Sequence, residues 1–189
     1  MVVACCAFGA YSANAQNVPI ESAYFPLASG NTWTYRCSLE GEYQTTKKVA
    51  LTTVTQNSGF KTYRMEVRVG KDPKPLVSYV YVSADGIVME AFKETLEDAR
   101  PLISVSPKVN QGFGDLKVVK IGRSDMEKYS KVKTVFLENY SAETPGISQE
   151  KYWAWRGKRY GQGIGLLVEA DGAGGDCELS TYRLKPARQ

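Results

Sequence analysis

The stretch TWTYRCSL, Thr32–Leu39, alternates strictly between two kinds of side chain. Trp33, Tyr35, Cys37 and Leu39 are large or apolar, whereas the residues between them are threonine, arginine and serine. Successive side chains of a β-strand point to opposite faces, so a period of two predicts a strand with one buried face. We therefore expect these rings and the cysteine to face the core of a sheet.

Similar patterns continue along the 189-residue chain. Residues 94–99 are expected to form one helical turn that ends before Pro101, and Leu102–Gly114 is expected to be an irregular crossing. About nine or ten strands with short turns and no long helical period predict a mainly β, antiparallel fold. The further strands are expected at residues 43–55, 62–69, 76–83, 87–92, 116–121, 131–141, 152–155, 166–170 and 177–184.

The N-terminal segment predicts the compartment. Residues 1–15, MVVACCAFGAYSANA, carry no charge, are too few to span a bilayer as a helix, and end in Ala-Asn-Ala. This pattern predicts a signal peptide over residues 1–15, a mature chain that begins at Gln16, and a single β domain over residues 16–189. An alternative is that Val2-Val3-Ala4-Cys5 is a lipobox, which makes Cys5 a lipid anchor. In both cases we expect an exported protein of the periplasm or extracellular space, with no transmembrane segment.

Two cysteines remain after the predicted leader, Cys37 and Cys177. An even pair in an oxidising compartment favours a disulfide bond. The alternative is a pair of free buried thiols, which pack like small apolar side chains. A catalytic cysteine is not favoured, because the chain has no histidine and no CxxC motif.

Both ends of the chain resemble a broad group of exported bacterial proteins and lipoproteins. The matching stretches are YFPLASGNTWTY, from Tyr24, and YGQGIGLLVEA, from Tyr160. The resemblance implies a single strongly curved antiparallel sheet with little helix, similar to the half-barrels of bacterial lipoprotein carriers. It implies no activity. The two cysteines are not part of the matching pattern.

Several chemistries lose their usual residues in this sequence. The absence of histidine removes the common general base of serine and cysteine hydrolases and the commonest zinc ligand. Gly161, Gly163 and Gly165 lack the following helix and Lys-Ser/Thr pair of a phosphate loop, so we interpret them as glycines that let a strand bend. We therefore expect no enzymatic activity, no cofactor and no metal site.

Charged groups of the sequence also admit ordinary explanations. The net charge is +4, and basic residues alternate with acidic ones, which predicts no nucleic-acid partner. Arg156, Lys158 and Arg159 are expected in a solvated, glycine-containing loop. The acidic group Glu94, Glu97 and Asp98 is expected to be solvated, and the pair Asp171 and Asp176 is interpreted as hairpin-turn chemistry in preference to a calcium site.

One aromatic cluster is the candidate ligand-binding site: Tyr152, Trp153, Trp155 and Tyr160. Adjacent Tyr152 and Trp153 must point to opposite faces of a strand, so at least one large ring lies away from the main core. The alternative is aromatic packing between strands.

Three functions remain compatible with the sequence. The first is a non-catalytic exported protein that binds an apolar or amphipathic small molecule on a curved sheet. The second is an envelope module that binds another envelope protein. The third is a carboxylate-dependent polysaccharide hydrolase, for which the sequence gives no positive sign.

Overall fold

The protein forms a single antiparallel sheet of twelve strands. The computed structural model describes residues 23–39, 42–139, 156–171 and 175–185. Apart from one 3-10 turn, η3 at Glu127–Tyr129, the regular structure in these ranges is β. The strands are β1 Thr32–Leu39, β2 Glu42–Asn57, β3 Phe60–Val69, β4 Leu76–Val82, β5 Ile87–Ala91, β6 Arg100–Ser104, β7 Gly112–Phe113, β8 Leu116–Arg123, β9 Lys133–Asn139, β10 Arg156–Gly161, β11 Gly165–Asp171 and β12 Gly175–Arg183.

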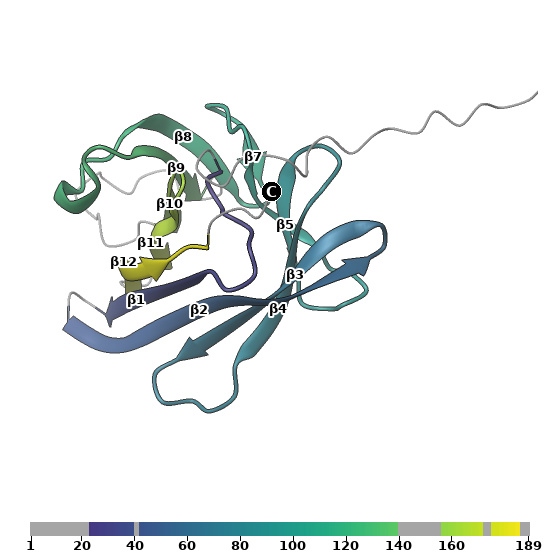
Figure 1. Ribbon diagram of the computed structural model, residues 1–189. Helices are drawn as coiled ribbons and strands as arrows, with labels where there is room; N and C mark the ends of the chain where they lie inside the picture. The colour runs from purple at the N-terminus through teal and green to yellow at the C-terminus, as the bar shows by residue number, and fades with distance from the viewer. Residues whose placement is uncertain (1–22, 40–41, 140–155, 172–174, 186–189) are drawn as a thin grey trace, which may run out of the picture.

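The sheet curls until its two edges nearly meet. Its strand order is β6-β5-β4-β3-β2-β1-β12-β11-β10-β9-β8-β7, so the first and last strands pair at the centre. The edge strands β6 and β7 approach each other without a hydrogen-bonded ladder. Figure 1 shows the strands turning around a common interior. The predicted mainly β, strongly curved antiparallel sheet is confirmed, and its curvature brings the sheet nearly to a closed barrel.

The interior of this barrel is the hydrophobic core. Trp33 and Tyr35 are each 2% exposed and Cys37 is 8% exposed, so the alternation predicted for β1 is confirmed. Arg36, which lies between Tyr35 and Cys37 in the sequence, is exposed. Bulky aliphatic side chains from the other strands complete the core: Leu51, Val80, Val88, Ile103, Val118, Val135, Leu137, Leu167 and Leu179.

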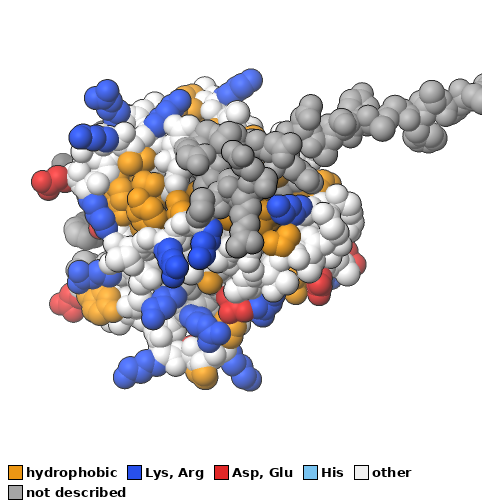
Figure 2. All heavy atoms as spheres, in the orientation of Figure 1, with side chains coloured by type: hydrophobic (Ala, Val, Ile, Leu, Met, Phe, Trp, Pro, Cys, Tyr) orange, Lys and Arg blue, Asp and Glu red, His pale blue; other side chains and the backbone are white. Residues whose placement is uncertain are grey.

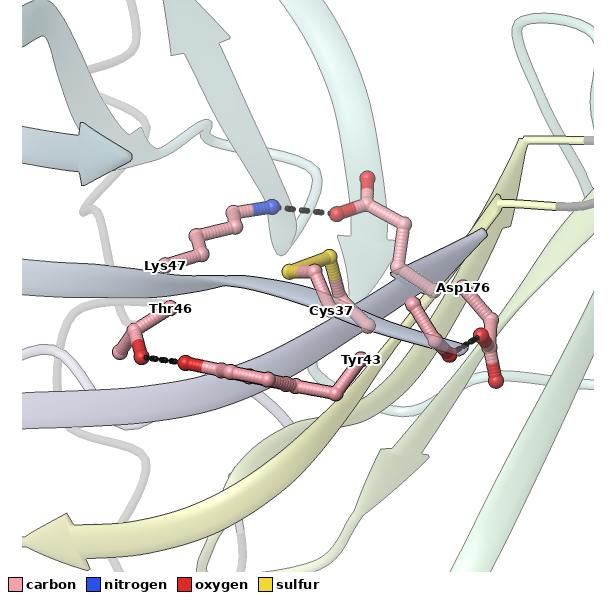
Figure 3. Close-up of a disulfide and its surroundings, with 8 residues drawn as sticks. Cys37, Tyr43, Thr46, Lys47 and Asp176 are labelled. Carbon is pink, nitrogen blue, oxygen red and sulfur yellow. Dashed lines mark hydrogen bonds and ion pairs between the residues drawn. A yellow bond between two sulfur atoms is a disulfide. The ribbon is translucent and has the colours of Figure 1, made fainter. Parts of the chain in front are cut away.

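The disulfide bond predicted from the cysteine count is present. Cys37 on β1 and Cys177 on β12 are directly opposite in the register of the two strands, and their sulfur atoms are 2.06 Å apart. Figure 3 shows this bond beside the side chain of Lys47. The bond therefore covalently links β1, the first strand of the chain, to β12, the last strand.

A segment of β structure appears where the sequence predicts a loop. Residues 156–161 form β10, which pairs with β9 and β11. Arg159 forms an ion pair with Asp125, and its guanidinium carbon lies 4.0 Å from the centroid of the Phe136 ring. The prediction of a solvated basic loop is wrong, because these residues form a strand in which Lys158 pairs with Glu169 and Arg159 with Asp125.

The middle of the chain also differs from the sequence prediction. Residues 94–99 form turns and no helix, and they lie against the outer face of β4 and β5, where Leu96 packs with Tyr81 and Ala91. Leu102–Gly114 is only partly irregular, because it contains most of β6 and the short β7. Local sequence patterns there are weak, and pairing with neighbouring strands decides the structure.

No helix among the described residues has both the length and the apolar character to cross a membrane.

Candidate functional site

A cavity of about 160 Å³ lies inside the sheet, between β1–β6 on one side and β10–β11 on the other. Two side chains of its lining, Leu76 and Phe92, are 68% and 48% exposed, so the cavity reaches solvent beside them. Its walls divide into an aromatic part and a charged part. The lining residues are Phe25, Trp33, Tyr35, Lys47, Val49, Met65, Val67, Leu76, Val77, Ser78, Glu90, Phe92, Leu102, Lys158, Tyr160, Leu166 and Glu169.

The aromatic wall is held in place by hydrogen bonds to backbone carbonyls. The indole nitrogen of Trp33 donates to the carbonyl of Ile164 at 2.6 Å, and the Tyr35 hydroxyl donates to the carbonyl of Leu166 at 3.1 Å. The Phe25 ring lies 6.0 Å from the Trp33 ring and 6.3 Å from the Tyr160 ring, centroid to centroid. Since backbone acceptors satisfy the polar atoms of Trp33 and Tyr35, these rings contribute apolar surface to the cavity.

The charged wall centres on Glu169 of β11. Its carboxylate forms ion pairs with Lys47 of β2 and with Lys158 of β10, the latter at 3.3 Å. Lys158 and Glu169 are direct partners in the β10–β11 register, whereas Lys47 comes from β2, which β1 and β12 separate from β11 in the sheet. A fourth charged group, Glu90 of β5, accepts a hydrogen bond from Ser78 at 2.8 Å.

These contacts fix the protonation states of the central groups. Burial raises the pKa of Glu169, but Lys158 and Lys47 outweigh burial and lower the pKa from 4.5 to about 2. The neighbouring Tyr160 hydroxyl, together with Glu169 and Glu90 and against the effect of burial, raises the pKa of Lys158 well above its ordinary value. At neutral pH, Glu169 is therefore ionised and Lys158 is protonated.

Of the four aromatic residues predicted as a ligand site, Tyr160 lines the cavity and is 1% exposed. Burial is the main cause that raises the pKa of Tyr160 to about 12, so its hydroxyl is neutral at physiological pH. Tyr152, Trp153 and Trp155 lie outside the described residues. The structure adds two rings that the alternation had placed in the core, Trp33 and Tyr35.

The charged wall was missed by the sequence analysis. Lys47 lies in a polar, threonine-rich strand and is separated from Glu169 by 122 positions, so no local motif joins them. The inward position of Lys47 follows from the β1–β2 register, in which Lys47 pairs directly with buried Tyr35.

The acidic residues weighed in the sequence have structural explanations. Asp98 accepts backbone N–H bonds from Phe92 and Lys93, which lower its pKa, and Glu97 pairs with Lys93 at 3.1 Å on the surface. Among the described residues, no group of three or more His, Cys, Asp or Glu side chains is placed to hold a metal ion. The side chain of Asp171 lies outside the described part, and Asp176 accepts a hydrogen bond from Ser38.

Comparison with known proteins gives the fold and no activity. No family model matches the sequence. No curated protein matches it either. Two solved structures are similar. The first is a "putative exported protein with YmcC-like fold" from Bacteroides fragilis, with a TM-score of 0.53 and 12% sequence identity, covering 86% of this chain and 99% of the other. The second is a "putative lipoprotein" from Parabacteroides distasonis, with a TM-score of 0.50 and 12% sequence identity, covering 85% of this chain and 98% of the other. The predicted resemblance to exported proteins and lipoproteins is thus confirmed at the level of structure, and the chain has a YmcC-like fold.

Proposed function

We propose that the protein is an exported, non-catalytic binding protein whose cavity holds the apolar part of an amphipathic molecule. The observation that carries this proposal is the division of one cavity into an aromatic wall, around Trp33 and Tyr160, and a charged wall, around Glu169. Ligand sites are typically concave and mostly apolar, with a few convergent polar groups that orient the ligand.

Export is supported by three independent features. The disulfide bond between Cys37 and Cys177 suits an oxidising compartment. Residues 1–15 have the uncharged, small and apolar composition of a leader that ends in Ala-Asn-Ala. The similar structures are those of a "putative exported protein" and a "putative lipoprotein". We propose cleavage after Ala15, with lipidation of Cys5 as the alternative.

The state of the charged groups gives no positive sign of catalysis. A glycoside hydrolase needs one carboxyl group that stays protonated as the general acid. Glu90 and Glu169 both line the cavity, but the pKa of Glu169 is lowered to about 2 by its two lysine partners. Lys158 has a raised pKa, which makes it a poor general base for Ser78. The hydrolase alternative therefore gains no support from these groups.

The second alternative, an envelope interaction module, needs a continuous exposed apolar surface. On the face drawn in Figure 2, the hydrophobic side chains form separate patches among Lys and Arg side chains. Lys158 and Arg159 lie within a strand and are paired with Glu169 and Asp125, so these two residues offer no ready surface for a nucleic acid. A small amphipathic molecule is therefore the partner that we propose.

The test combines a native ligand search with a cavity-filling variant. Native mass spectrometry of protein purified from its own envelope is expected to show a bound molecule. Val67→Trp adds a ring to a half-buried position in the cavity wall, so it is expected to abolish that bound mass. Val119→Trp is the matched control, because Val119 is 39% exposed on β8 and is expected to keep the ligand.

Two results would contradict the proposed function. The first is purified protein that carries no molecule and shows no amide shifts at Val49, Met65 or Leu166 when 1-hexanol is added. The second is a bound molecule that Val67→Trp and Val119→Trp retain equally while both variants remain folded by circular dichroism. In the second case, the ligand occupies another part of the protein.

A further inference from the structure

The charges that the described residues bring to the cavity lining balance one another. Lys47 and Lys158 each contribute one positive charge, and Glu90 and Glu169 each contribute one negative charge. Among the described residues, no other Asp, Glu, Lys or Arg side chain lines the cavity. The lysine and Glu169 side chains are between 19% and 28% exposed, so water reaches them only in part. An additional charge there would meet an environment that is already neutral.

We propose that the polar end of the ligand is an uncharged group that both donates and accepts hydrogen bonds, such as a hydroxyl or an amide. This inference rests on the proposed function of the same cavity. It specifies the chemical class of the ligand, which the shape of the cavity alone does not.

The hydrogen-bonding capacity of the charged wall supports an uncharged polar group. Each lysine ammonium has three N–H donors, and Lys47 and Lys158 each use one toward Glu169. The Oε1 atom of Glu90 accepts from Ser78, and a carboxylate has further lone pairs. A hydroxyl can accept from an unused ammonium N–H and donate to a carboxylate oxygen. An added carboxylate or ammonium could use the same donors or acceptors, but it would leave the partly desolvated cavity with a net charge.

The same geometry sets the orientation and size of the ligand. Trp33 and Tyr160 are 2% and 1% exposed, so the aromatic wall is the deep end of the cavity. Lys47 and Lys158 are 19% and 26% exposed, which places the charged wall nearer the mouth. A dry cavity of about 150 Å³ holds a benzene molecule, so an apolar tail of about six heavy atoms fits the 160 Å³ here.

Three probes with the same six-carbon chain test the inference: 1-hexanol, hexanoate and hexylammonium at pH 7. Binding is followed by the amide shifts of Val49, Met65 and Leu166, which line the cavity. We expect 1-hexanol to bind about tenfold more tightly than either charged probe, because only the charged head groups leave the cavity with a net charge.

Charge variants separate head-group recognition from general affinity. Glu90→Gln leaves the cavity one positive charge in excess, so hexanoate is expected to gain about tenfold relative to 1-hexanol. Lys158→Gln leaves a negative excess and is expected to favour hexylammonium in the same way. Glu97→Gln is the control for Glu90→Gln, since Glu97 is 63% exposed on the surface and both substitutions remove one negative charge.

The outcomes distinguish this inference from the proposed function. Hexanoate or hexylammonium binding as tightly as 1-hexanol, or a preference that Glu90→Gln and Lys158→Gln leave unchanged, would overturn the inference while the binding function stands. If no probe binds and the native protein carries no molecule, the proposed function fails and the inference falls with it.

Discussion

Cys37 and Cys177 lie directly opposite each other across the β1–β12 pair, with Cα atoms 4.0 Å apart although 140 positions separate them in sequence. The disulfide bond thus joins the first strand of the chain to the last strand. The bond restrains a very long loop in the unfolded chain, which is the condition under which a disulfide stabilises most.

Removal of this bond is expected to lower the free energy of unfolding by about 2–5 kcal/mol. The variant is Cys37→Ser combined with Cys177→Ser, which leaves no free thiol in the pair. Urea unfolding measures the difference, and a reducing agent should bring the native protein to the stability of the variant. Equal unfolding midpoints of the two proteins without reductant would contradict this account.

Gly165 permits the close approach of Trp33 to the β10–β11 turn. Its φ is +111°, and a Cβ there would lie 3.0 Å from the Trp33 indole nitrogen. Gly165→Ala should therefore cost about 1–3 kcal/mol more in unfolding free energy than Gly59→Ala. Gly59 is a suitable control because its φ is +82° and a Cβ would meet nothing within 4 Å. Similar losses for both variants would show that the Trp33 contact carries no penalty.

The Glu169 ion pairs predict a loss of stability in acid. The pKa of Glu169 is about 2 in the folded protein and 4.5 ordinarily, so the unfolded chain binds the proton more readily. Stability from this group is present above pH 4.5 and is lost as the pH falls toward about 2, by about 3 kcal/mol. Urea unfolding from pH 6 to pH 2 should show this loss in the native protein.

Two variants isolate the contribution of Glu169. Glu169→Gln should have a shallower decrease of unfolding free energy between pH 4.5 and pH 2, because it removes the titrating group. Glu97→Gln should keep the native slope, since Glu97 is largely exposed. Parallel pH profiles of the native protein and Glu169→Gln would contradict the assignment.

Asn31 connects three segments of the chain. Its side chain is fully buried, donates to the carbonyl of Pro26 at 3.0 Å and accepts the backbone N–H of Lys185 at 2.8 Å. Asn31→Ala leaves these two groups without their partner, which should cost about 1–3 kcal/mol of unfolding free energy. Asn57→Ala is the control, because the Asn57 amide makes one exposed bond of 3.3 Å to Glu94. A loss for Asn31→Ala no larger than for Asn57→Ala would argue against this role.

The fold was largely predictable because its strands have strong local signals. The alternation of Trp33, Tyr35 and Cys37 predicts a buried face, and two remaining cysteines in an exported chain predict their own pairing. β10 was not predictable from local pattern, since RGKRYG combines charges with glycines and resembles a turn. It is a strand because β9 and β11 pair with it on both sides.

The candidate site was predictable only in part. Tyr160 was singled out and lines the cavity, but its contact with a ligand stays a prediction. The ion pair of Glu169 with Lys158 follows from the β10–β11 register, whereas the pair with Lys47 joins β11 to β2, which β1 and β12 separate in the sheet. Sequence periodicity predicts which face of the sheet a side chain points to, but it does not predict the partner of that side chain on a distant strand.

The strand order has a consequence for folding. Every hydrogen-bonded neighbour in the sheet is also a neighbour in sequence, except β1 and β12. Residues of β1–β6 and of β7–β12 can therefore pair by local hairpins, which form early because short loops cost little entropy. β1 keeps one unpaired edge until β12 is available, and such edges readily pair with other chains. During synthesis, which proceeds from the N-terminus, the chain is thus open to misassembly until the nine residues of β12 have been made.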